Sequence, residues 1–100
     1  MKTTIQEVDG RVVVTLDGEM DTAAAVEVDE KLKPFYMEQN KDVVLDCAGL
    51  EYIASSGLRI LLSILKAAKA CGHSVIMRNV NPDIKNVFEL TGFINIFTFE

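Results

Sequence analysis

Two adjacent hydroxyl side chains, Ser55 and Ser56, are the residues of this chain best placed for chemistry. An apolar run over 43–46 leads through a connecting segment into this pair, and a second apolar run of helical character follows from Leu58. Unpaired backbone N–H groups and the positive end of the helix dipole meet at a helix start, so an added phosphate would have a strong effect there. The pair therefore indicates either phosphorylation of a serine or simple capping of the helix by a hydroxyl.

Enzymatic interpretations of this serine pair are not supported by its neighbours. A nucleophile elbow needs glycine where the chain has Ile53, and the single histidine, His73, is predicted in a surface turn beyond the following helix. The glycines form no dinucleotide or Walker motif. Cys47 and Cys71 lack a CxxC spacing, and we expect both to be reduced thiols in or near the core. The sequence predicts no enzyme, no cofactor and no metal site.

Length and charge narrow the class of partner. The chain has 100 residues, 49% of them hydrophobic, and a formal charge of -5, which predicts one domain spanning 1–100 with a packed core. An acidic chain is a poor match for nucleic acid or an anionic membrane surface. The N-terminus lacks the apolar core of a signal peptide, and the longest apolar segment is interrupted by charges, which argues against membrane insertion. We expect a cytoplasmic protein with a protein partner.

Strand and helix patterns alternate along the chain. Strand-like segments cover 3–8, 11–17, 41–46, 74–78 and 94–99, and the first two flank the hairpin signal Asp9-Gly10. The first helical pattern is capped by Asp21 and has Pro34 near its end, and Asn40 begins the next turn; its predicted core positions are Ala25, Val28, Leu32 and Phe35. The last of the three helical patterns is bounded by Asn81-Pro82 and Gly92, and Ile84, Val87 and Phe88 are expected on its inner side.

The middle helix is predicted to be capped by Ser55 or Ser56 and closed by Cys71-Gly72. Its predicted core side is Leu58, Leu61, Leu62, Leu65 and Ala68, and its polar side is Arg59, Ser63 and Lys66. Ile60, Ile64 and Ala67 widen the apolar arc. Either neighbouring helices cover this flank or a partner protein uses it.

The order β-β-α-β-α-β-α-β predicts an α/β fold with a mostly parallel sheet, an antiparallel N-terminal strand and right-handed crossover helices. The strand over 41–46 is expected to be covered on both faces. Asp46, at its end, should bond N–H groups of the following loop. Turns holding Glu19, Asp21 and Glu51 should meet at one edge, so that a phosphate on the serine pair would face like charge.

Three stretches resemble the STAS domains, and among them the bacterial anti-sigma factor antagonists. The first is 18–21, the second combines 43–46 with Leu50, Ile53 and 55–58, and the third combines Asn81, Val87 and 90–93. The resemblance implies a protein without catalysis that binds an anti-sigma factor, itself a serine kinase of the histidine-kinase-like ATPase type, and thereby releases a sigma factor.

In that family, phosphorylation of the first serine of the pair reverses binding and a serine phosphatase restores it. The resemblance thus implies Ser55 as the switch residue, with Ser56 second. The implied partner surface is Glu19, Asp21, Thr22, Ser55, Ser56, Gly57, Arg59 and Ile60. The chain departs from the pattern at Ala54, where phosphorylated antagonists usually have aspartate. The alternative within the family is a non-switching STAS subunit of a membrane lipid-transport complex.

Overall fold

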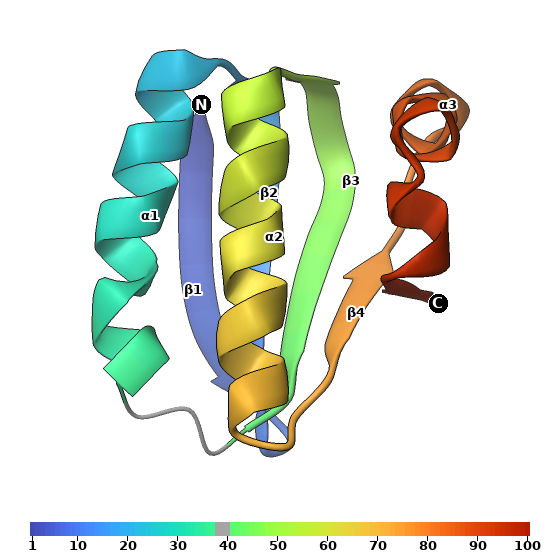
Figure 1. Cartoon of the computed structure of the whole chain (residues 1–100). Coiled ribbons are helices and arrows are strands. Elements are labelled where there is room, and N and C mark those ends of the chain that lie inside the picture. The colour runs from blue at the N-terminus through green and yellow to red at the C-terminus, as the bar shows by residue number, and fades with distance from the viewer. Residues whose placement is uncertain (38–40) are drawn as a thin grey trace.

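The computed structural model describes residues 1–37 and 41–100, with side chains described for 1–34 and 41–100. Five strands form one sheet in the order β1-β2-β3-β4-β5, and helices connect the parallel strands (Figure 1). The predicted α/β fold with an antiparallel N-terminal strand is therefore confirmed. The elements are β1 (Lys2–Val8), β2 (Arg11–Met20), α1 (Thr22–Met37), β3 (Val43–Ile53), α2 (Ser55–Ala70), β4 (Val75–Arg78), α3 (Pro82–Thr91), the 3-10 turn η1 (Phe93–Asn95) and β5 (Thr98–Phe99).

The first two strands form the predicted hairpin. Val8 and Arg11 are partners across the turn, and Asp9 and Gly10 have φ values of 53° and 77°. Both central residues of this turn are left-handed, as in the type I′ turn whose twist matches that of the flanking strands. The Asp-Gly pair thus sets the register of β1 on β2.

The helices share one face of the sheet. Parallel crossovers are almost always right-handed, and here each one advances to the next strand in the same direction, which places successive helices on the same side. Ile84 and Phe88 of α3 accordingly join the core under α1 and α2. The 41–46 strand is covered on both faces as predicted, since Val43, Val44 and Leu45 are all buried. No helix of the described residues lies over the second face, where Val44 is 0% exposed.

Two strand predictions need correction. β3 does not end at 46 but continues to Ile53, because its pairing with β2 runs on to Met20 through two register shifts. Glu19 and Glu51, expected in turns, therefore lie within strands. The strand expected over 94–99 is reduced to β5, since Gly92 ends α3 at φ 80° and the chain then forms η1.

An aromatic cluster accounts for this path of the C-terminal segment. The ring centroids of Phe88 and Phe97 are 6.2 Å apart, and those of Phe93 and Phe97 are 6.0 Å apart. Phe99 lies 6.0 Å from Phe88. Rings at these separations attract one another beyond their burial of apolar area. The cluster thus favours a compact turn over an extended strand.

The predicted core residues are mostly correct. Ala25, Val28 and Leu32 are buried in α1, and Pro34 lies near its end; the Phe35 side chain and Asn40 fall outside the part of the chain that is described. In α2 the positions expected inside are buried except Leu62, which is half-buried, while Ile64 is 1% exposed. Val87 of α3 is likewise only half-buried. Helix α2 is thus rotated slightly from the predicted orientation, toward Ile64.

The two cysteines have different environments. Cys47 is buried, and burial raises the pKa of its thiol to about 12, which keeps it protonated at neutral pH. Cys71 is exposed at the end of α2, because the Cys71-Gly72 turn leaves the helix on the solvent side, so its predicted near-core position is wrong. Within residues 1–37 and 41–100, none of the helices combines the length and hydropathy needed to cross a membrane.

Asn81 joins α3 to the sheet through both ends of its amide. Its Oδ1 accepts a hydrogen bond from Ile84 N at 2.9 Å, and its Nδ2 donates to Leu50 O at 2.8 Å. Pro82 follows at the first helical position, where its missing N–H has no consequence for helix bonding. The cap predicted from Asn81-Pro82 is confirmed.

We expect Asn81→Ala to lower the free energy of unfolding by about 1–3 kcal/mol, because it removes the cap and leaves Leu50 O without its amide donor. Urea denaturation measures the change. Asn86→Ala, on the exposed side of the same helix, is the matched control and should alter stability by less than about 0.5 kcal/mol. Equal effects of the two substitutions would show that the Asn81 amide does not hold α3 on the sheet.

Candidate functional site

The starts of α1 and α2 lie side by side at one end of the sheet. β2 and β3 are parallel neighbours that end together, with Met20 opposite Ile53, and Ala54 N donates a hydrogen bond to Met20 O at 2.9 Å. Each strand passes into its helix within two residues, so the two helix starts are adjacent (Figure 1). Across them, Ser56 Oγ donates to Thr22 Oγ1 at 3.2 Å.

The prediction that a serine caps α2 is wrong. The N-cap residue is Ala54, at φ −81° and ψ 167°, and no side chain among the described residues caps this helix. Because Ala54 N bonds to Met20 O of the neighbouring strand, Ala54 is the residue between strand and helix. Ser55 and Ser56 are therefore already inside the first helical turn. The neighbouring helix follows the prediction, since Asp21 Oδ1 accepts from Ala24 N at 2.9 Å.

Ser55 is exposed at the first position of α2. The N–H groups of a first helical turn have no intrahelical acceptor and form the positive end of the helix dipole. An oxyanion attached to the Ser55 hydroxyl would be close to these donors. The site is therefore suited to carrying a phosphoryl group. The acidic side chains predicted for the same edge, Glu19, Asp21 and Glu51, are all exposed.

The same geometry does not build a hydrolytic site on Ser55. His73, the single histidine of the sequence, lies beyond the other end of the 16-residue helix α2, about 24 Å away along its axis. Its Nδ1 lies 3.2 Å from Asp42 Oδ1 instead. Ser74 N–H also bonds this carboxylate, and together with His73 it holds the pKa of Asp42 below its usual value although burial opposes the charge. Among the described residues, no group of three His, Cys, Asp or Glu side chains could hold a metal ion.

Gly57 is where α2 comes closest to the strands. A Cβ atom at this position would lie 2.8 Å from Ile53 Cγ1, 3.1 Å from Met20 Cγ and 3.2 Å from Met20 O. Distances this short are closer than van der Waals contact allows, so a side chain would push the helix start off the strand ends. The close approach predicted for Gly57 is present, and it sets the height of Ser55 and Ser56 above the sheet.

Asp46 has a structural role, as predicted, although it lies within β3 and not at its end. Its Oδ1 accepts from Ala48 N at 3.1 Å, and its Oδ2 accepts from Arg78 at 3.1 Å. Burial opposes the charge of this carboxylate, but these hydrogen bonds hold its pKa below the ordinary value. Asp46 thereby connects β3 to β4 on the face without helices.

The structure brings most of the predicted site residues to one edge. Thr22 and Ser56 are in contact, Arg59 is exposed one turn into α2, and Ile60 is half-buried. Tyr52 was not predicted as a site residue, yet it is 51% exposed and is the partner of Glu19 in the sheet. Its sequence signal is the pair Glu51-Tyr52, two consecutive residues between Leu50 and Ile53 that interrupt the alternation of a strand.

A mixed sheet whose strands follow one another in chain order, with two adjacent helix starts at one end, is the fold of the anti-sigma factor antagonist SpoIIAA. The unphosphorylated form of that protein superposes with a TM-score of 0.80 over 99% of this chain and 87% of its own, at 20% identity. The phosphorylated form from Bacillus gives 0.79 over 99% and 91%, at 21% identity. Residues 2–100 match the family model described as STAS domain, and the chain belongs to the STAS domain family.

Curated relatives extend the similarity to the sequence. BtrV of Bordetella bronchiseptica, which carries the name of an anti-sigma factor antagonist, is 32% identical over 97% of this chain and 84% of its own length. The anti-sigma-B factor antagonist of Staphylococcus epidermidis is 30% identical over 79% of this chain and 73% of its own. The resemblance found in the sequence is therefore confirmed.

Gly57→Ala should lower the free energy of unfolding by about 1–3 kcal/mol, since overpacking against Ile53 and Met20 outweighs the gain in helix propensity. Thermal or urea unfolding measures the change. Ser63→Ala, on the exposed side of α2, serves as control and should stay within about 0.5 kcal/mol of the parent chain. A Gly57→Ala variant at least as stable as the parent would contradict the close packing described.

Ala54→Asp should raise the free energy of unfolding by about 1 kcal/mol, because the extended backbone of Ala54 suits an N-cap and aspartate would accept from the unfilled N–H groups. The gain should disappear below the pKa of the new carboxyl, which denaturation at neutral and acidic pH would show. Ala48→Asp, at an exposed strand position, is the matched charge control. No gain in the free energy of unfolding at neutral pH would mean that the N–H groups at the start of α2 already have acceptors.

Proposed function

We propose that this chain is an anti-sigma factor antagonist that binds its anti-sigma factor through the paired helix starts of α1 and α2. Membership of the STAS family and the named activities of BtrV and the staphylococcal relative support this proposal. The observation that carries it is the exposed Ser55 hydroxyl at the uncapped start of α2, beside the Ser56–Thr22 contact. The chain acts by binding, without catalysis of its own, and works in the cytoplasm, where sigma factors act.

The proposed binding surface consists of Glu19, Asp21, Thr22, Ser55, Ser56, Gly57, Arg59 and Ile60. Thr22 and Ser56 hold the two helix starts together, and Gly57 lets the backbone of α2 sit low enough for a partner to reach both. Arg59 is one turn beyond Ser55 and offers a cation to a carboxylate of the partner. The surface combines hydroxyl, acidic and basic groups in a small area, which favours a specific protein contact.

The proposed switch is phosphorylation of Ser55 by the anti-sigma factor, a serine kinase of the histidine-kinase-like ATPase type. The kinase transfers a phosphoryl group from ATP to Ser55 Oγ, and a serine phosphatase removes it. The group adds about −1.5 to −2 charges at pH 7. The helix start stabilises this charge within the chain, while Glu19, Asp21 and Glu51 make the same edge strongly negative toward a partner. Binding then weakens without unfolding of the domain.

The test uses the purified anti-sigma factor encoded by the same genome. We expect Ser55→Ala to bind it like the parent chain and Ser55→Glu to bind at least about a hundredfold more weakly, as measured by calorimetry. With ATP present, intact-mass spectrometry should find one added phosphate on the parent chain and on Ser56→Ala, but none on Ser55→Ala. Circular dichroism of each variant controls for folding.

A partner that binds Ser55→Glu as tightly as the parent chain would contradict the switch. If that partner were a transporter ATPase or permease, the chain would be a constitutive STAS subunit of a membrane lipid-transport complex. Phosphate on Ser56 in place of Ser55 would move the switch by one residue and leave the binding surface in place.

A further inference from the structure

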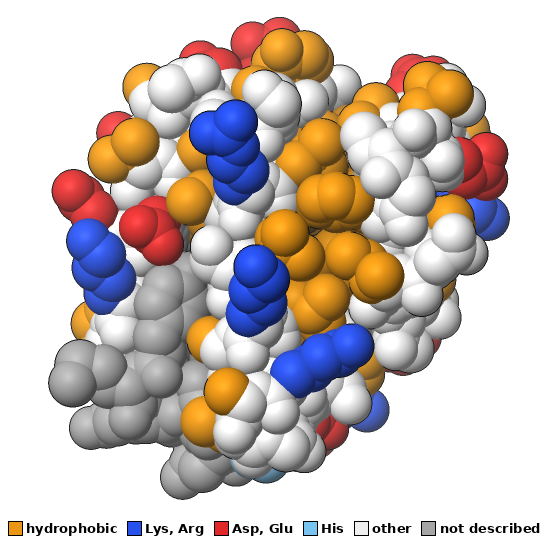
Figure 2. Space-filling view, in the orientation of Figure 1, with side chains coloured by type: hydrophobic (Ala, Val, Ile, Leu, Met, Phe, Trp, Pro, Cys, Tyr) orange, Lys and Arg blue, Asp and Glu red, His pale blue; other side chains and the backbone are white. Residues whose placement is uncertain are grey.

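A second surface of the domain lies between α2 and α3, away from the paired helix starts. Hydrophobic side chains gather there in a hollow between the two helices (Figure 2). Helix α2 packs on α1, whereas the described residues of α3 pack mainly on β3 and η1, so the two helices leave a gap over the core. Partly buried apolar residues of α2, of α3 and of the segments that flank α3 include Leu62, Val80, Val87, Phe93 and Ile94.

Helical spacing shows which side of α2 borders the hollow. Ser56 contacts α1, so the flank of α2 that includes Ile60 and Ala67 faces α1. The opposite flank of the buried face is a stripe at positions i, i+4, i+7 and i+11, formed by Leu58, Leu62, Leu65 and Lys69. On α3, helical spacing places Val87 on the flank opposite Lys85 and Glu89, which are both exposed.

The charge of α2 contrasts with that of the chain. The protein carries −5 overall, but α2 contains Arg59, Lys66 and Lys69 and no acidic residue. Basic side chains form a row along the exposed ridge of this helix beside the hollow (Figure 2). No ion pair is formed by Lys66 or Lys69 in the part of the chain that the structure describes. An apolar hollow with a basic border is complementary to an acidic amphipathic helix.

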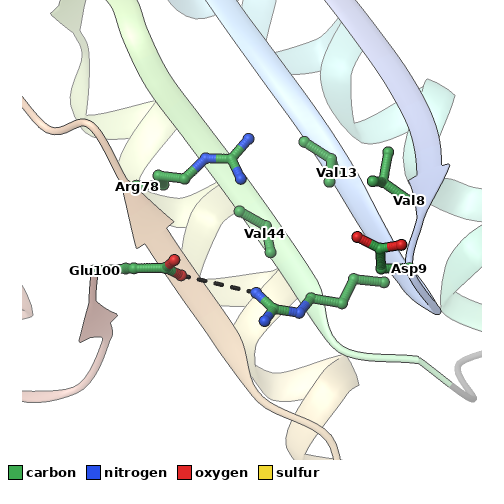
Figure 3. A pocket seen from close by; sticks show the side chains of 7 residues that line it. Val8, Asp9, Val13, Val44, Arg78 and Glu100 are labelled. Carbon is green, nitrogen blue, oxygen red and sulfur yellow. Dashed lines mark ion pairs between the residues drawn. The ribbon is translucent and has the colours of Figure 1, made fainter.

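The second face of the sheet is a weaker candidate. A shallow pocket there has Val13 and Val44 as its floor, with Arg11 and Arg78 beside them (Figure 3). Arg11 lies 3.7 Å from Glu100, and Arg78 lies 3.1 Å from Asp46. Each guanidinium is already paired with a carboxylate, so neither is available to bind an anionic ligand in this pocket.

We propose that the hollow between α2 and α3 binds an amphipathic helix of a partner protein, with its leucine face against Leu62 and Val87 and its acidic flank against Lys66 and Lys69. The stripe from Leu58 to Lys69 is about 16 Å long, which matches three turns of a helix. A concave surface suits a helix better than the flat surface of a bilayer. The stripe begins one turn beyond Ser55 on the same flank of α2, and its central contacts, Leu62, Lys66 and Lys69, lie about two to four turns from that residue.

The test uses the full chain labelled with ¹⁵N and two synthetic helical peptides with the same leucine stripe, one flanked by glutamates and the other by lysines. We expect the acidic peptide to shift amide signals of Leu58, Leu62, Val87 and Lys69, with affinity that falls as salt rises. The lysine peptide should leave them unchanged. Lys66→Glu/Lys69→Glu should weaken the acidic peptide at least about tenfold and gain affinity for the basic one.

A matched control separates a local contact from a general effect of net charge. Lys2→Glu/Lys33→Glu makes the same change in net charge on β1 and α1 and should leave peptide affinity within about twofold. Leu62→Ser should abolish binding while the domain stays folded. Equal affinity for both peptides, shifts confined to other surfaces, or binding to vesicles with anionic headgroups but not to the acidic peptide would each overturn the proposal.

Discussion

The parallel pairing of β2 with β3 is the constraint on which the rest of the domain depends. It ends with Met20 opposite Ile53 and with the hydrogen bond from Ala54 N to Met20 O. Two helices must then start from neighbouring strand ends, and they share one face because every crossover advances in the same direction. Gly57 allows α2 to sit directly on these strand ends. The paired helix starts are thus a consequence of sheet topology and of one missing side chain.

The same constraint changes the meaning of the serine pair. Because the sheet pairing extends to Ala54, the capping position has no hydrogen-bonding side chain, and both serines lie inside the helix. Ser56 then bonds Thr22 across the helix starts, while Ser55 stays exposed. Aspartate at the capping position would occupy the free N–H donors with its own carboxylate. With alanine there, the donors remain open to a group attached to Ser55.

The two sides of the sheet have different roles. On the face without helices, Arg11 and Arg78 form ion pairs beside Val13 and Val44. Long polar side chains, and not helices, therefore border these two buried valines. The helical face carries both proposed contact surfaces, at the start of α2 and along its outer flank. Helix α2 therefore carries the exposed Ser55 hydroxyl at its start and, about three to four turns further on, Lys66 and Lys69 at the border of the apolar hollow.

The sequence by itself determined the order of elements, the hairpin at Asp9-Gly10, the cap at Asn81 and the STAS family, because periodicity, turn residues and short motifs are local signals. Tertiary structure decided how far β3 extends, which residue caps α2 and how α2 is rotated about its axis, with Ile64 inside and Leu62 at the hollow. It also replaced most of the last expected strand by an aromatic cluster. These outcomes depend on pairing and packing between segments distant in sequence, which no local pattern encodes.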